Sequence, residues 1–272
     1  MSGDHPWVRP PAVAGSFYPS SPDQLQALVQ ECLAATARPW PDAPPPPGPP
    51  RAIVVPHAGL VYSGPIAATA YLRAAAHADA ISRVVLLGPS HRVAFAGIAA
   101  SSADAFATPL GLVTVDRAMV DEAVRHRAAF ISDEAHAAEH SLEVQLPFLR
   151  TLLPEARLAP FVVGDATPDE VAHLLSLAWD EPETLVVIST DLSHYHHYQE
   201  ATELDRRTAA HIVALRPDRI SGRDACGSRP LRGLLLEARR RHLRVEQLDL
   251  RSSGDTAGDR DRVVGYGAFA IA

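Results

Sequence analysis

Short, nearly continuous runs of Val, Ile, Leu and Ala recur along the chain, and each run is flanked by Gly or Pro. Because polar positions do not alternate with apolar ones in most of these runs, the pattern is typical of strands buried on both faces of a sheet. We therefore expect strands at residues 52–55, 84–87, 97–100, 158–163, 185–189, 245–250 and 263–271.

Helical spacing of apolar positions fills most of the intervals between these runs. The regular alternation of strands and helices predicts an α/β fold, with a mostly parallel or mixed central sheet covered by helices on both faces and with closing strands that run antiparallel. The Gly- and Asp-rich segment 252–262 predicts an exposed, hairpin-like turn. The expected helices span residues 65–76, 116–127, 139–152, 168–179, 201–215 and 230–242.

The first part of the chain is predicted to be an arm that packs on this body. Ser21 as N-cap and Pro22 at the first helical position predict a helix that reaches about residue 36. The proline-rich stretch 39–50 cannot be helical or form a central strand, so it is expected to be an extended surface connector. With 272 residues, the chain is expected to form a single domain over 1–272.

The composition argues against several classes of partner. A net charge of −7 and a pI near 6.0 disfavour nucleic acid and anionic membranes, because phosphate binding needs a basic surface. No apolar run approaches the length of a membrane span, and residues 1–11 do not resemble a secretion signal, so we expect a cytoplasmic protein. With only two cysteines, Cys32 and Cys226, a disulfide framework is not expected.

Three of the predicted strands lead into segments that contain a histidine. His57 and His91 follow the strands at 52–55 and 84–87, and His194 follows Asp191 after the strand at 185–189. Carboxyl ends of parallel strands meet at one edge of a sheet, so these side chains are expected to converge there. A single histidine in such a place is more often structural, but three in matching contexts indicate a metal or acid–base site.

Two further segments carry candidate chemistry. His140 and Glu143, three residues apart, would share one face of the expected helix, and an ordinary capping arrangement is the alternative. Pro147 is expected to end or kink that helix. Cys226 stands in a turn before the last expected helix, where the helix terminus and Arg223 or Arg229 would favour thiolate; these local features leave an inert cysteine equally open.

Six motifs follow one another along the chain: Ala14-Gly-Ser-Phe-Tyr18, Pro56-His-Ala-Gly59 with Tyr62, Leu87-Gly-Pro-Ser-His91, Glu139-His-Ser-Leu-Glu143, Ser189-Thr-Asp-Leu-Ser-His194 and Cys226-Gly227. In these motifs the sequence resembles the Memo family, also known as the B component of the AmmeMemoRadiSam system. The resemblance implies a fold similar to class III extradiol dioxygenases, metal ligands at His57, His91 and Cys226, and Asp191 and His194 close by.

The chain departs from the family pattern in two places. Phe17 stands where relatives often have Trp, and Leu192-Ser193 stands where relatives can carry Phe-Cys. Phe17 and Tyr62 are expected to line the pocket, so peptide recognition attributed to relatives does not transfer directly.

Two imidazoles and one thiolate leave an open coordination position, which is typical of a catalytic metal site. The resemblance implies iron or copper and redox or oxygen chemistry, with zinc compatible by ligand type. Asp191, His194, His140 and Glu143 are the candidate acid, base or orienting groups.

Two alternative functions are compatible with the same residues. The first is a non-catalytic binding component, with radical-SAM and AMMECR1-like proteins of the same system as partners and a small molecule or peptide as ligand. The second is a zinc-type hydrolase in which His194 or Glu143 activates water.

Overall fold

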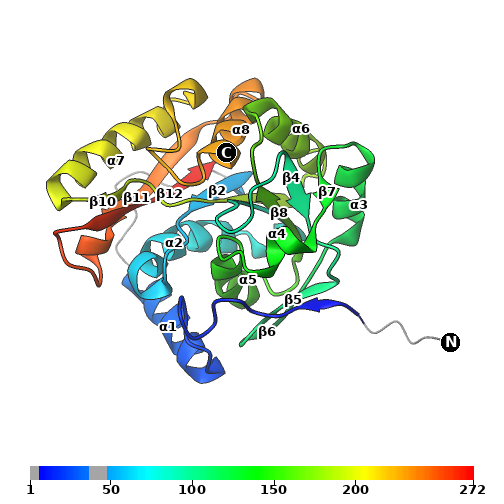
Figure 1. The fold of residues 1–272 in the computed structure, drawn as a ribbon, viewed down its shortest axis with the longest axis horizontal. Helices are drawn as coiled ribbons and strands as arrows, with labels where there is room; N and C mark the ends of the chain where they lie inside the picture. Colours follow the sequence, from blue (N-terminus) through cyan, green and yellow to red (C-terminus); the bar gives the residue numbers. More distant parts are fainter. Residues whose placement is uncertain (1–5, 37–47) are drawn as a thin grey trace.

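The computed structural model describes residues 6–36 and 48–272, and a mixed sheet lies at its centre (Figure 1). In the described residues the sheet has nine strands in the order β10-β12-β2-β9-β3-β8-β4-β7, with β11 paired to β12. The strands are β2 (Ala52–Val55), β3 (Arg83–Pro89), β4 (Ile98–Ala100), β7 (Phe130–Ile131), β8 (Arg157–Val163), β9 (Thr184–Ser189), β10 (His194–His196), β11 (Val245–Ser252) and β12 (Val263–Ile271).

The middle of the sheet is parallel, and antiparallel pairings flank it on both sides. Strands β2, β9, β3 and β8 run parallel to one another, whereas β12 runs antiparallel to β2, β10 and β11, and β4 runs antiparallel to β8. All residues of β2 and β9 are buried, which is why their sequences are continuously apolar. The predicted mixed sheet with antiparallel closing strands is therefore confirmed.

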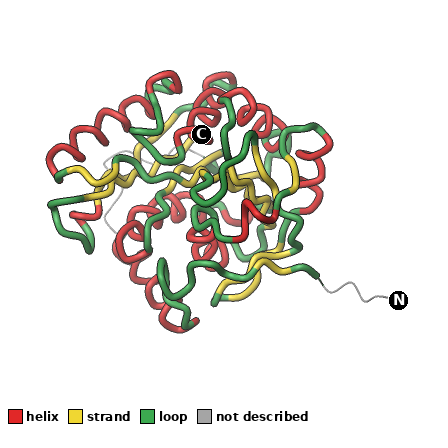
Figure 2. Tube along the Cα trace, viewed as in Figure 1, coloured by secondary structure: helices red, strands yellow, loops and turns green. Residues whose placement is uncertain are grey.

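Helices cover both faces of the sheet, as predicted. Figure 1 shows α6, α7 and α8 above the sheet and α1, α2 and α5 below it, and Figure 2 shows the strands as a layer between the helices. The helices are α1 (Pro22–Ala35), α2 (Leu60–Ala75), α3 (Arg117–Arg125), α4 (Asp133–Ala137), α5 (Leu146–Leu152), α6 (Pro168–Ala178), α7 (Tyr198–Val213) and α8 (Ser228–Arg240). No helix of the described segments is long and apolar enough to cross a membrane.

The N-terminal arm packs against the body, as expected. Its strand β1 (Val8–Arg9) joins β5 (Ala105–Thr108) and β6 (Gly111–Thr114) in a small three-stranded sheet. These three short strands were not predicted, because they lack a long apolar run. Most of the proline-rich connector expected at 39–50 lies outside the described residues.

The prediction of a single helix over residues 139–152 is wrong. Residues 139–142 form a turn, a 3₁₀ turn spans Glu143–Gln145, and α5 begins only at Leu146. The Glu139 carboxylate accepts the backbone N–H groups of His140 and Ser141, which stabilises the turn in place of helical hydrogen bonds. Pro147 lies in the first turn of α5, where its missing N–H costs nothing, so it helps to begin that helix rather than end it.

Candidate metal centre

The carboxyl ends of three adjacent parallel strands bring the predicted residues together. In the sheet, β9 lies between β2 and β3, with Val55 beside Ser189 and Leu87 beside Ile188. His57 follows β2 by two residues and His91 follows β3 by two, so both reach the same edge, with ring centroids 5.2 Å apart. The predicted convergence of these two histidines is confirmed.

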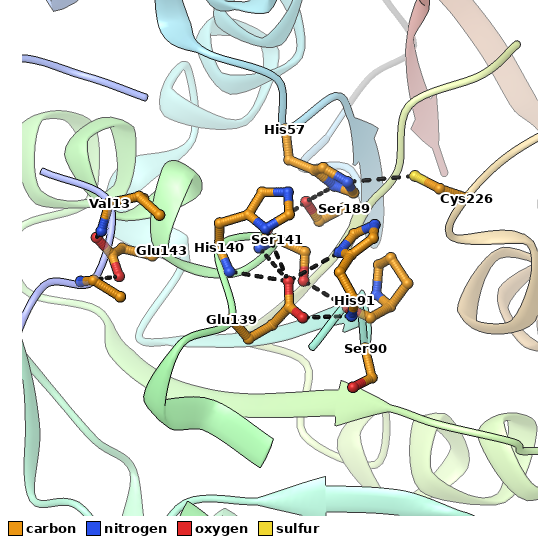
Figure 3. Close-up of polar contacts among 12 residues, drawn as sticks. Val13, His57, Ser90, His91, Glu139, His140, Ser141, Glu143, Ser189 and Cys226 are labelled. Carbon is orange, nitrogen blue, oxygen red and sulfur yellow. Dashed lines mark hydrogen bonds and ion pairs between the residues drawn. The ribbon is translucent and has the colours of Figure 1, made fainter. Parts of the chain in front are cut away.

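Cys226 meets the two histidines from the loop before α8. The donor nitrogens of His57 and His91 and the sulfur of Cys226 all lie within 4.8 Å of one another. His57 Nε2 is 3.3 Å from Cys226 Sγ, close to the separation of about 3.5 Å between two ligands of a tetrahedral first-row ion. Figure 3 shows this approach. The three side chains can therefore hold one metal ion.

The tautomer of His57 follows from its hydrogen bonds. The Ser189 hydroxyl donates its only proton to the carbonyl of Ser141, at 2.6 Å, and accepts from Gln145 Nε2, at 2.9 Å. His57 Nδ1, 2.9 Å from the same hydroxyl, must then be the donor. The proton is on Nδ1, so the Nε2 lone pair faces Cys226 and is available to a metal.

His57 is also held neutral. Burial, followed by the neighbouring His91 and His140, lowers the pKa of His57 well below its ordinary value. Neutral imidazole is the form that binds metals. The lowered pKa and the Nδ1–H tautomer of His57 therefore both favour metal binding through Nε2.

Glu139 orients His91 in the same way. The backbone N–H of His91 donates to Oε2 at 2.5 Å, and His91 Nδ1 lies 3.0 Å from Oε1. Burial alone would raise the pKa of Glu139, but hydrogen bonds from His91 and Ser141 outweigh it and lower the pKa to about 2. The ionised carboxylate fixes the Nδ1 proton of His91 and leaves Nε2 as the donor atom.

A second grouping, His91, Glu139 and His140, also has its donor atoms within 4.8 Å of one another. The Oε1 atom of Glu139 already accepts the N–H groups of His140 and Ser141 in addition to the contact with His91. A metal bound there would have to displace several hydrogen bonds of an oriented carboxylate. The set with Cys226 is therefore the better metal site.

Cys226 is more tightly protonated than its sequence context predicts. Burial, together with the charge of Asp191, raises the pKa of Cys226 to about 12, although the backbone N–H of Asp191 donates to Sγ at 3.3 Å. The expectation that Arg223 or Arg229 would favour thiolate is wrong, because Arg229 pairs with Asp165 at 2.7 Å and Arg223 is exposed. The thiol keeps its proton until a metal displaces it.

Asp191 and His194 both line the cavity above the metal centre. Asp191 Oδ1 accepts the backbone N–H of His57 at 2.7 Å, so it also fixes the loop that carries this ligand. Burial raises the pKa of Asp191 to about 6, with the hydrogen bond from His57 acting in the opposite direction. His194 belongs to β10 and stands beside Tyr195, whose ring centroid is 5.8 Å away.

His140 lies against both the metal ligands and the N-terminal arm. Its ring centroid is 4.6 Å from that of His91 and 4.6 Å from that of Phe17. Burial lowers the pKa of His140 to about 4, so the ring is neutral near pH 7. It forms part of the cavity wall, as Phe17 does.

Glu143 has a different environment from the one expected. Its Oε2 accepts from Arg9 at 2.7 Å and from the Ala12 N–H, and its Oε1 accepts from the Val13 N–H and from the Tyr18 hydroxyl at 2.6 Å. Figure 3 shows it beside Val13, apart from the metal ligands. Glu143 is fully buried and anchors the arm that carries Phe17, without lining the cavity.

The cavity has a volume of about 620 Å³, within the usual range for small-molecule sites. Tyr62 is 39% exposed and stands at its mouth, and Arg262 lies over the Tyr195 ring at 5.1 Å. The turn between β11 and β12 is a hairpin, as expected, and forms one wall. The lining residues are Phe17, His57, Ala58, Gly59, Tyr62, His91, His140, Asp191, His194, Tyr195, Ser253, Gly258, Asp259, Arg262, Val264 and Tyr266.

Sequence spacing does not indicate the roles of three residues that support the site: Glu139, Ser189 and Gln145. Glu139 and Ser189 lie within the quoted motifs, so their place in the sequence was a signal. Their hydrogen bonds to His91 and His57 depend on contacts between distant loops, which spacing alone does not reveal.

Comparison with known proteins finds relatives over nearly the whole chain. Residues 9–270 match the family model described as Memo-like protein. A MEMO1 family protein of Methanopyrus kandleri is 34% identical, over 97% of this chain and 98% of its own length. Those of Ignicoccus hospitalis and Methanothermobacter thermautotrophicus are 35% and 34% identical, over at least 95% of this chain. The chain belongs to the Memo family.

Proposed function

We propose that this protein is a metal-dependent redox protein that binds one iron or copper ion through His57, His91 and Cys226. The observation that carries the proposal is the orientation of both imidazoles. Ser189 and Glu139 hold the Nδ1 protons, so both Nε2 atoms are free to bind an ion beside the sulfur.

The donor set is compatible with a redox metal. Thiolate is a soft ligand that suits copper(I) and iron as well as zinc, and two imidazoles suit all three. Three protein ligands leave a coordination position for a substrate or oxygen. Bound iron or copper would supply one-electron or oxygen chemistry there.

The residues around the centre are suited to proton movement and to exclusion of water. Asp191, with its pKa near 6, can hold or release a proton at neutral pH from a position in the cavity wall. His194 is the second acid–base candidate in that wall. Phe17, Tyr62 and Tyr266 supply aromatic surface against which a small organic ligand or a peptide side chain can pack.

Metal analysis of anaerobically purified protein tests the proposal. We expect about one equivalent of iron or copper in the natural chain and a loss of most of it in Cys226→Ala. Cys32→Ala is the matched control, because Cys32 is the other cysteine and lies buried in α1, away from the cavity. Equal metal in Cys226→Ala and the natural chain would remove Cys226 as a ligand.

Two other functions predict different results. In a zinc-type hydrolase, His194 or Asp191 would have to activate water, because both oxygens of Glu143 are already hydrogen-bonded. Hydrolysis that a chelator leaves unaffected would exclude this zinc-type hydrolase. A binding component would form a stable complex with radical-SAM or AMMECR1-like proteins that survives His57→Ala unchanged. Zinc alone in the anaerobic protein would favour the hydrolase over the redox protein.

A further inference from the structure

A second cavity lies on another side of Cys226. It has a volume of about 450 Å³ and is formed by the segment after β3, the end of β8 and the loop that leads into α8. Cys226 lines this cavity, whereas His57 and His91 line the first one. The lining residues are Pro89, Ser90, Val93, Ala94, Phe95, Val163, Gly164, Asp165, Ser221, Gly222, Cys226, Ser228, Arg229 and Arg232.

The charge of this cavity is positive. Arg229 is neutralised by Asp165, since Nη2 and Oδ1 are 2.7 Å apart. Arg232 has no carboxylate within ion-pair distance among the described residues, and its Nε is buried without a hydrogen-bond partner. The Arg232 guanidinium is therefore a cation with unused donors in the wall of a cavity.

Ser228 supplies a second unused donor. The residue is only 6% exposed, and no hydrogen bond within the described part of the chain involves its hydroxyl. The other two serines of the wall are engaged: Ser90 donates to the carbonyl of Val93, and Ser221 donates to Asp224. Ser228 is also the first residue of α8, where the helix dipole favours negative charge.

We propose that this cavity is an anion site, separate from the metal centre, that binds a small oxyanion, either a phosphate or a carboxylate group. Arg232 and Ser228 donate hydrogen bonds to the anion, and the N-terminus of α8 adds favourable electrostatics. The cavity is larger than one such group, and Val93, Phe95 and Val163 give it an apolar wall, so the anion belongs to a small organic molecule. Because Cys226 shares the wall, the ligand binds beside a metal ligand.

Calorimetric titration of the full chain, at constant ionic strength, tests this site. Inorganic phosphate and acetate are the two probes, and chloride is the reference for non-specific ionic effects. We expect one of the two oxyanions to bind at one site, and the stronger probe identifies the group. Binding of neither probe above the chloride reference would overturn the proposal.

Variants locate the site. Arg232→Gln is expected to weaken binding about tenfold or more, because a charge-assisted hydrogen bond is lost, and Ser228→Ala a few-fold. Arg239→Gln, an exposed position on the same helix, is the matched control and should bind as the natural chain does. If Arg232→Gln fails to fold, the anion affinity of Ser228→Ala tests the assignment instead. Unchanged affinity in the folded variants would overturn the assignment.

Discussion

The carboxylate of Glu139 is the most informative group to change, because it orients His91 without being a proposed metal ligand. In Glu139→Gln, the side chain keeps its size and loses its charge. The amide nitrogen, wherever it is placed, faces N–H groups that the carboxylate accepts: those of His91, His140 and Ser141. At least one hydrogen bond is replaced by a repulsive contact.

The magnitude follows from the pKa of Glu139, which falls from 4.5 to about 2 in the folded protein. At 1.36 kcal/mol per unit, the ionised form stabilises the fold by about 3 kcal/mol. The folded pKa is below the unfolded one, so this stability is present above pH 4.5 and is lost as the pH falls toward 2. Loss of such an orienting partner typically weakens metal binding about 10- to 100-fold.

Two assays measure these effects. Competition with a chelator gives the metal affinity, and urea unfolding of the metal-free protein at pH 7 gives the free energy of unfolding. Glu134→Gln is the control, because Glu134 is an exposed glutamate of the neighbouring α4. An affinity within twofold of the natural chain in Glu139→Gln would refute the argument that Glu139 prepares His91 for the metal.

Further predictions concern the supports of the site. Burial lowers the pKa of His136 to about 4 in the folded protein, so the unfolded chain binds a proton at higher pH than the folded one. The free energy of unfolding therefore falls as the pH drops from 6.5 to 4. In His136→Asn, urea unfolding should show a free energy of unfolding that depends less on pH over this range. Glu143→Gln removes the carboxylate partner of the buried Arg9, so the free energy of unfolding should fall by about 3–5 kcal/mol. Proteolysis of the N-terminal arm should then be faster. Cleavage at the natural rate would contradict the anchoring role of Glu143. In Gly227→Ala, the added Cβ would lie 2.6 Å from the Thr190 side chain and 2.8 Å from the carbonyl of Ser189. The displaced Cys226 should bind less metal by elemental analysis, and full occupancy would show that the loop adapts.

The strand-end part of the site was predictable from the sequence. The continuous apolar runs before His57 and His91 identified buried strands, and the geometry of parallel sheets then placed both histidines at one edge. The local sequence of Cys226 did not decide between ligand and inert cysteine, because its partner His57 is 169 residues away along the chain.

The rest of the site depends on contacts between side chains that the spacing of residues in the sequence does not reveal. Helical periodicity predicted that His140 and Glu143 share a face, but Glu139 closes a turn there and the two side chains reach different environments. The thiol of Cys226 was expected to be acidic from its charged neighbours in sequence. Burial and Asp191 dominate in the folded chain and raise its pKa instead.

X-ray absorption at the metal edge of the loaded full chain tests the central claim most directly. Coordination by His57, His91 and Cys226 predicts one sulfur at about 2.3 Å and two imidazole nitrogens at about 2.0 Å. A spectrum with only nitrogen and oxygen neighbours would contradict the proposed centre.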